Sequence, residues 1–140
     1  MFKSITIVVP SLVHALSKDG KCRILALRGG GVHGSFEVGV LKAFTELLDP
    51  EEIAYDYISG VSIGAVNGSI LSTYMPGEER AAVEELETLY TKYSPSDYWN
   101  YWPYYIVEPF YKQSFVDNSK LLDILEEKLG SRPFKRKFCF

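Results

Sequence analysis

Ser62 stands in the segment Gly60-Val61-Ser62-Ile63-Gly64, which satisfies the pattern G-x-S-x-G. This pattern is typical of a nucleophile elbow, a sharp turn between a strand and a helix that exposes a serine hydroxyl. The two glycines leave room for the neighbouring strand and helix to pass each other. The helix that follows directs its free N–H groups toward the serine, where they favour negative charge. These residue types indicate acyl transfer with Ser62 as the nucleophile.

A glycine-rich segment precedes this motif along the chain. Gly29, Gly30, Gly31 and Gly34 satisfy G-x-G-x-x-G. Successive glycines can direct several backbone N–H groups at one point because no side chain interferes, so such a turn binds a phosphate or an oxyanion. A dinucleotide is one alternative ligand, because the spacing is also that of a Rossmann turn. That alternative requires an acid at the end of the second strand, whereas Asp56 lies at its beginning.

Both motifs must be positioned by the elements around them. The apolar run CRILALR is typical of a strand buried on both faces, as in a parallel sheet. The hydrophobic spacing then predicts a helix, a second strand and a second helix, over residues 35–48, 55–62 and 63–75. This order predicts a parallel α/β fold in which both motifs lie at the carboxyl edge of the sheet. We therefore expect the glycine N–H groups and the serine to converge.

The second half of the chain continues the alternation. Residues 77–94 predict an amphipathic surface helix, and residues 117–130 predict a helix with a polar cap at its start and Gly130 at its end. Between them, the aromatic-rich segment 98–111 is interpreted as an irregular crossover. Its aromatic side chains favour core packing over a lipid-facing surface. A further strand is predicted from Lys135 onward.

Composition excludes several classes of function. The net charge of the 140 residues is -3, which provides no basic footprint for nucleic acid. Cys22 and Cys139 show no C-x-x-C spacing, and the two histidines, His14 and His33, cannot complete a metal-ligand cluster. We expect no metal and no cofactor.

The first seventeen residues have the layout of a signal peptide, with one lysine, a short apolar run and then small residues. A buried first strand is the alternative. A signal at 1–17 would send the protein to the secretory route or an endomembrane lumen, where Cys22 and Cys139 could form disulfides. Without it, a cytoplasmic or membrane-associated location is expected.

From Ile24 onward, the two motifs in this order resemble the patatin-like phospholipase family. The matching segments are LALRGGGVHGSFEVGVL and YDYISGVSIGAVNG. The resemblance implies that residues 22–140 are the N-terminal portion of a three-layer α/β/α domain with a mainly parallel sheet. It also implies a lipid acyl hydrolase acting on membrane phospholipid or another acyl-ester lipid. Ser62 would be the nucleophile of a Ser-Asp dyad, with the backbone of Gly29, Gly30 and Gly31 as the oxyanion hole.

The chain departs from the family pattern in two ways. Arg28 and His33 stand where the family often has other residue types, before the first and the fourth glycine. No D-G-G or D-G-A turn follows Ser62, so we expect the aspartate base beyond residue 140 and little activity from this chain alone. A Ser-His-Asp hydrolase fits less well because both histidines precede the serine. The remaining alternative is an inactive domain that binds lipid or a partner.

Overall fold

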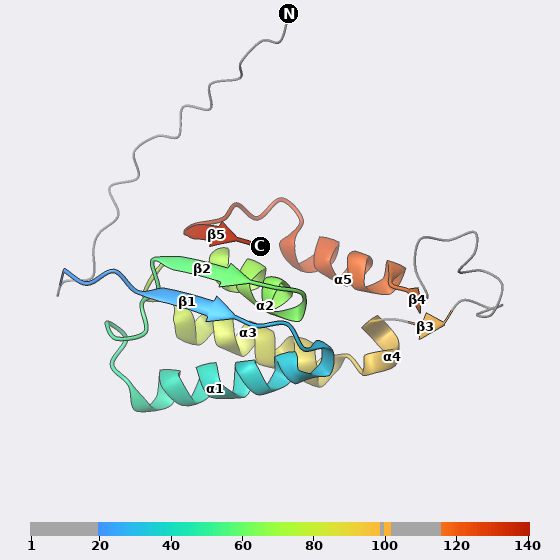
Figure 1. The fold of residues 1–140 in the computed structure, drawn as a ribbon, viewed down its shortest axis with the longest axis horizontal. Helices are drawn as coiled ribbons and strands as arrows, with labels where there is room; N and C mark the ends of the chain where they lie inside the picture. Colours follow the sequence, from blue (N-terminus) through green and yellow to red (C-terminus); the bar gives the residue numbers. More distant parts are fainter. Residues whose placement is uncertain (1–19, 99, 102–115) are drawn as a thin grey trace, which may run out of the picture.

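A three-stranded parallel sheet forms the centre of the molecule, for which a computed structural model describes residues 20–98, 100–101 and 116–140 (Figure 1). Its order is β1-β2-β5, with bounds Ile24–Leu27, Tyr57–Gly60 and Lys137–Cys139. Leu25 pairs with Ile58, and Ile58 pairs with Phe138. The predicted α/β fold with a parallel sheet is confirmed.

The four longer helices follow the predicted pattern, with ends that differ by a few residues, and the short α4 is an addition to it. The helices are α1 (Gly34–Leu47), α2 (Ile63–Ser72), α3 (Glu79–Lys92), the short α4 (Pro95–Tyr98) and α5 (Ser119–Leu129). A 3-10 turn, η1 (Gly31–His33), precedes α1, and two short antiparallel strands, β3 (Asn100–Tyr101) and β4 (Val116–Asp117), precede α5. The carboxylate of Asp117 accepts a hydrogen bond from the N–H of Ser119 at 3.0 Å. Gly130 ends α5 with a φ of 36°, a conformation that suits glycine.

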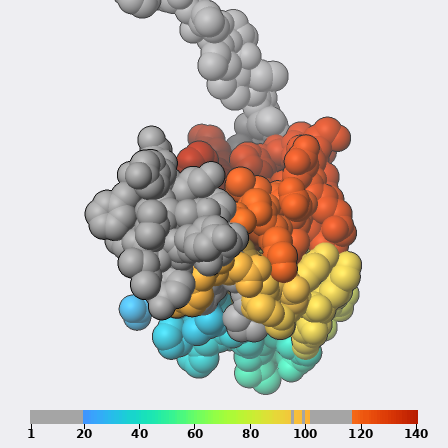
Figure 2. Space-filling view, turned by 90° about the vertical axis from the view of Figure 1, so that its right-hand side faces the viewer, coloured from blue at the N-terminus to red at the C-terminus, as the bar shows by residue number. Residues whose placement is uncertain are grey.

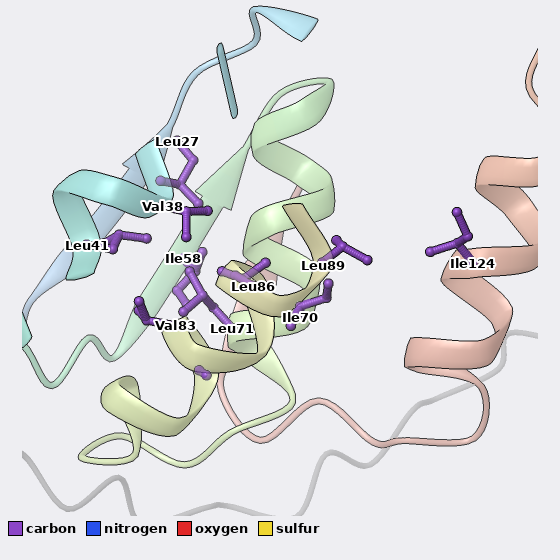
Figure 3. Close-up of a cluster of buried hydrophobic side chains, with 11 residues drawn as sticks. Leu27, Val38, Leu41, Ile58, Ile70, Leu71, Val83, Leu86, Leu89 and Ile124 are labelled. Carbon is purple, nitrogen blue, oxygen red and sulfur yellow. The ribbon is translucent and has the colours of Figure 1, made fainter. Parts of the chain in front are cut away.

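The hydrophobic core lies between one face of the sheet and the helices. In Figure 1, α1 and α3 lie on one side of the sheet, and α2 packs directly against β2. The core joins apolar side chains from the strands and all the longer helices: Leu27, Val38, Leu41, Ile58, Ile70, Leu71, Ala82, Val83, Leu86, Leu89 and Ile124 (Figure 3). Burial of these side chains is the main force that fixes the sheet edge relative to α1 and α2.

The opposite face of the sheet is exposed in the described residues. The side chain of Ile24 is 68% exposed, and Ala26 and Cys139 on the same face are also exposed. The prediction that the first strand is buried on both faces is therefore wrong for this structure. The described helices cover one face of the sheet alone. The described residues therefore form two layers of the expected three-layer fold, the sheet and the helices on one face.

Cys22 and Cys139 cannot pair with each other in this fold. In the sheet, Cys139 of β5 lies opposite Ser59 of β2, which lies opposite Ala26 of β1. The strand β2 therefore separates the two cysteines, and Cys22 lies four residues before Ala26 along the chain. Two strand spacings and four residues of extended chain give a separation of roughly 16 Å, whereas a disulfide needs Cα atoms within about 7 Å. Both thiols are free and exposed.

A buried ion pair connects the start of β5 to the rest of the domain. The side chains of Arg136 and Glu79 are 0% and 2% exposed, and Arg136 Nη1 lies 2.7 Å from Glu79 Oε1. The same guanidinium donates hydrogen bonds to the backbone carbonyls of Tyr55, Tyr74 and Met75 at 3.0, 3.0 and 2.7 Å. Arg136 thereby joins the segment before β2, the segment after α2 and the first turn of α3.

Two predictions fall on residues outside the described part. The signal-peptide segment 1–17 lies outside it, and so does most of the aromatic segment 98–111. Among the described helices, none has both the length and the apolar character that crossing a bilayer requires.

Candidate active site

Ser62 occupies the turn between β2 and α2. Its backbone has a φ of 55° and a ψ of -123°, and it is the one described residue other than glycine with a positive φ. Its carbonyl accepts the N–H of Ala65 at 2.8 Å, which starts α2. The side chain is exposed. Such a strained conformation at a serine is typical of a functional turn.

The two glycines of the elbow lie where no side chain fits. A Cβ atom on Gly64 would lie 2.6 Å from the carbonyl oxygens of Leu27 and Arg28, at the end of β1. A Cβ on Gly60 would collide with the backbone of Gly64 itself. The elbow therefore packs against the end of β1 through backbone alone, and this contact brings Ser62 to the glycine-rich segment.

The glycine turn, residues 29–33, lies directly beside Ser62. A Cβ on Gly29 would lie 3.2 Å from Ser62 Cβ, so the two backbones are in close approach. Gly31 has a φ of 56°, which favours glycine. Within the described residues, the N–H groups of Gly29, Gly30 and Gly31 have no hydrogen-bond acceptor. The structure thus brings together the serine and the three glycines that the sequence pointed to.

Gly34 allows α3 to approach the turn. A Cβ there would collide with Ile63 and with the hydroxyl of Tyr90. That hydroxyl donates a hydrogen bond to Asn67 Oδ1 at 2.8 Å. Burial raises the pKa of Tyr90 to about 12, and this effect outweighs the hydrogen bond with Asn67, which lowers it. Tyr90 is therefore a protonated donor at neutral pH.

Asn67 and Glu37 are site residues that sequence reasoning missed. Asn67 is 0% exposed, and its amide nitrogen lies 3.2 Å from both Gly34 O and Glu37 Oε2. Glu37 Oε1 accepts the N–H of Arg28 at 2.8 Å. The available signal was a lone asparagine in the otherwise small and apolar segment of α2, because a buried amide needs partners.

An apolar cavity of about 520 Å³ opens beside Ser62. Its lining includes Ser62 at the elbow, Ile63 and Val66 of α2, Tyr90 of α3, Tyr98 of α4 and Leu121 of α5. Figure 2 views the molecule from this end and shows parts of α1 (cyan), α3 (yellow), α4 (amber) and α5 (orange) on the same face. Size and lining suit an apolar ligand chain next to the hydroxyl.

A second cavity of about 290 Å³ lies on the other side of the glycine turn. Arg28, His33, Phe36 and Glu37 contribute to its lining. His33 Nδ1 lies 2.8 Å from Gly30 O, so the ring is held against the turn. Arg28 and His33, the two departures from the family pattern, therefore share one cavity of mixed charge beside the site.

No described side chain forms a hydrogen bond with Ser62 Oγ. The carboxylate of Asp97 instead accepts hydrogen bonds from the hydroxyl and the N–H of Ser94, which lower its pKa. Asp117 caps α5, as expected, and Asp123 is exposed on that helix. Within the described ranges, no group of three His, Cys, Asp or Glu side chains is arranged to hold a metal ion.

Asp56 does not provide the acid that a dinucleotide site needs. It is 3% exposed, and its carboxylate accepts the N–H of Arg23 at 2.9 Å. Both residues lie before their strands, at the opposite end of the sheet from the glycine turn. The geometry therefore gives no support to the nucleotide alternative.

Comparisons with known proteins identify the family of the chain. A family model described as patatin-like phospholipase matches residues 25–138. The chain is 35% identical over 86 residues to the cUMP-AMP-activated phospholipase of Escherichia coli, covering 61% of this chain and 25% of that protein. It is 32% identical over 111 residues to the calcium-independent phospholipase A2-gamma of Rattus norvegicus, covering 78% and 14%. The human protein of that name matches at 31% over 111 residues, covering 78% and 13%.

The chain spans a quarter or less of the length of these relatives. No solved structure gives a significant match. The family match extends over most of the chain and includes both the glycine turn and the elbow. The chain belongs to the patatin-like phospholipase family.

Proposed function

We propose that the protein is a lipid acyl hydrolase in which Ser62 attacks the ester carbonyl. The observation that carries this proposal is the close approach of Gly29 to Ser62, with a Cβ-to-Cβ distance of 3.2 Å for a side chain placed on the glycine. This approach puts backbone N–H groups without described acceptors next to an exposed hydroxyl. Nucleophile and oxyanion donors at one point are what acyl transfer requires.

The apolar cavity supports an ester with a long acyl chain as the substrate. Its lining combines Ser62 with apolar and aromatic side chains, among them Ile63, Val66, Tyr98 and Leu121. An acyl chain in this cavity would place its carbonyl carbon near the serine hydroxyl and its carbonyl oxygen toward the glycine turn. Membrane phospholipids carry such chains, and all three relatives described above are named as phospholipases.

In the proposed mechanism, Ser62 Oγ attacks the carbonyl carbon and its proton passes to an aspartate outside the 140 residues. The tetrahedral oxyanion is stabilised by the N–H groups of Gly29, Gly30 and Gly31. Collapse of this intermediate expels the alcohol, which takes the proton from the aspartate. Water then hydrolyses the acyl-enzyme by the same route.

The test is labelling of the full-length protein with a fluorophosphonate, followed by mass spectrometry of the modified peptide. We expect modification at Ser62, loss of labelling and of fatty-acid release from phosphatidylcholine vesicles in Ser62→Ala, and retention of both in Ser119→Ala, an exposed serine on α5. Labelling at another serine, or hydrolysis that survives Ser62→Ala, would overturn the proposal. A protein that binds vesicles without either reaction would instead be an inactive lipid-binding member.

The dyad is tested separately with the 140-residue chain. An unactivated serine is a weak nucleophile, so we expect slow ester hydrolysis by this chain. Rapid hydrolysis that is lost in Ser62→Ala would keep the serine as nucleophile and refute the external aspartate.

A further inference from the structure

We propose that Asn67 and Glu37 are positioning residues that hold the glycine turn, residues 29–33, against the nucleophile. The proposal rests on the proposed function, because it treats the N–H groups of this turn as oxyanion donors. It adds two residues, one buried in α2 and one in the first turn of α1, that form hydrogen bonds with the chain around the turn and none with Ser62. Neither belongs to the G-x-S-x-G or G-x-G-x-x-G pattern.

Asn67 holds the end of the turn through a fully occupied amide. Its nitrogen donates to Gly34 O and to Glu37 Oε2, each at 3.2 Å, and its oxygen accepts from the hydroxyl of Tyr90 at 2.8 Å. A carbonyl and a carboxylate can only accept, so the nitrogen must face them and the oxygen must face the tyrosine. The side chain therefore has one satisfied orientation in a site that is 0% exposed.

Glu37 holds the start of the turn. Its Oε1 accepts the N–H of Arg28 at 2.8 Å, one residue before Gly29, while its Oε2 accepts from Asn67. The pair thus fixes the N–H group that precedes the turn and the carbonyl group of Gly34 that follows it. Between these two points, three short-range side-chain contacts reach the backbone of the turn: Arg28 Nε to Gly29 O at 3.4 Å, His33 Nδ1 to Gly30 O at 2.8 Å and Ser35 Oγ to Val32 O at 3.0 Å. All three come from the turn or its immediate chain neighbours, whereas Asn67 connects the end of the turn to α2.

An oxyanion turn built from glycines needs such support. Glycine gains no conformational restraint from a side chain, so successive glycines adopt many backbone conformations. Oxyanion donors must lie about 2.7–3.1 Å from the developing charge, and a displacement of about 1 Å can cost roughly 10²-fold in rate. Asn67 and Ser62 belong to the same short α2 segment. The Asn67 amide therefore fixes the position of the glycine N–H groups relative to α2, the helix that begins directly after Ser62.

The experiment compares Asn67→Ala, Glu37→Ala and Glu37→Gln in the full-length protein, with Ser72→Ala as the matched control. Ser72 is also 0% exposed on α2, but its hydroxyl bonds to Gly68 O within the same helix. Hydrogen exchange of the peptide that contains the glycine turn is measured beside kcat and KM for a soluble ester. Thermal melting shows how far each variant is destabilised.

We expect Asn67→Ala and Glu37→Ala to accelerate exchange of the hydrogen-bonded N–H groups on either side of the three glycines, those of Arg28 and His33, at least about tenfold. Both variants should lower kcat by about 10- to 100-fold, with KM within about twofold. Glu37→Gln keeps an acceptor for Arg28 N–H but places an amide nitrogen against the amide nitrogen of Asn67. Its exchange rate and its kcat should therefore lie between those of Glu37→Ala and those of the unchanged protein. Ser72→Ala should change neither the exchange of the turn nor kcat.

Three results would overturn the proposal. The first is unchanged exchange in the turn when Asn67 or Glu37 is replaced by alanine. The second is faster exchange in the turn without a decrease in kcat. The third is a decrease in kcat that also occurs in Ser72→Ala and that follows the decrease in melting temperature in all the variants. Failure of the proposed function has a different signature, because hydrolysis would then survive Ser62→Ala while hydrogen exchange still reports whether the two residues hold the turn.

Discussion

Replacement of Arg136 by methionine is the sharpest test of how this fold is held together. Methionine fills much of the same volume but removes every hydrogen bond of the guanidinium. The carboxylate of Glu79, 2% exposed, would keep two backbone donors, the N–H groups of Tyr55 at 3.2 Å and Gly77 at 2.7 Å, and no cation. The carbonyl groups of Tyr55, Tyr74 and Met75 would also each lose a hydrogen bond, although Met75 O keeps the N–H of Glu78 at 3.0 Å.

The expected loss follows from the uncompensated charge. Removing one partner of a buried ion pair costs about 3–5 kcal/mol, whereas a whole domain is stable by about 5–15 kcal/mol. For a chain of this length, that loss corresponds to a melting temperature lower by roughly 10–20 °C. The matched control is Arg132→Met. Arg132 contacts Glu85 at 2.9 Å, but its side chain is 35% exposed, so its loss should cost about 1 kcal/mol or less.

Urea denaturation of Arg136→Met, Arg132→Met and the double variant Arg136→Met with Glu79→Gln measures these free energies. The double variant should recover part of the loss, because a neutral amide at position 79 leaves no buried charge without a partner. A cost for Arg136→Met below about 1 kcal/mol, or no difference between the single and double variants, would refute the reasoning. The first result would mean that Glu79 is solvated, and the second that the lost carbonyl contacts dominate.

Three further predictions concern the site. Gly64→Ala would place a methyl group 2.6 Å from the carbonyl oxygens at the end of β1; it should cost about 1–3 kcal/mol in urea denaturation and abolish labelling of Ser62, and unchanged labelling would contradict the packing of the elbow. The pKa of Tyr90, raised to about 12 by burial, means that the unfolded chain loses this proton first, so folding stability should fall as pH rises from about 10 to 12. Tyr90→Phe should remove this part of the pH dependence and one high-pH transition in an ultraviolet titration at 295 nm, and an unchanged titration would contradict it. Val66→Phe should fill part of the apolar cavity and raise KM for long-chain esters at least about tenfold while short-chain esters react as before; an equal effect on both would place the acyl chain elsewhere.

The convergence at the site could be predicted because it depends on local pattern and on one rule of topology. The apolar run before Arg28 and the run before Gly60 each predict a strand, and parallel strands end at the same edge of a sheet. The positive φ of Ser62 follows from the elbow motif itself. The structure places Ser62 directly beside Gly29, and the sequence predicted this convergence.

The supporting residues could not be predicted in the same way, because their roles arise between elements distant in the sequence. Asn67 looks like one polar residue in a buried helix, and its partners lie 30 and 33 residues earlier and 23 residues later. Arg136 stands in a strand predicted from Lys135 onward, and nothing in that pattern marks this one basic residue as buried, yet it is 5% exposed. Exposure of Ile24 likewise depends on which faces of the sheet are covered, which hydrophobic spacing in one strand does not specify.

The backbone of Ser62 has a consequence for how this family member can change over time. Its φ of 55° is a conformation that costs about 1–3 kcal/mol for a residue with a Cβ and that glycine adopts without strain. Alanine would remove the hydroxyl and keep the strain, whereas glycine would remove both. Under the proposed mechanism, the chain therefore retains a strained residue at the position where a nucleophile is needed. Replacement of Ser62 by glycine would remove the proposed nucleophile and at the same time increase the stability of the fold.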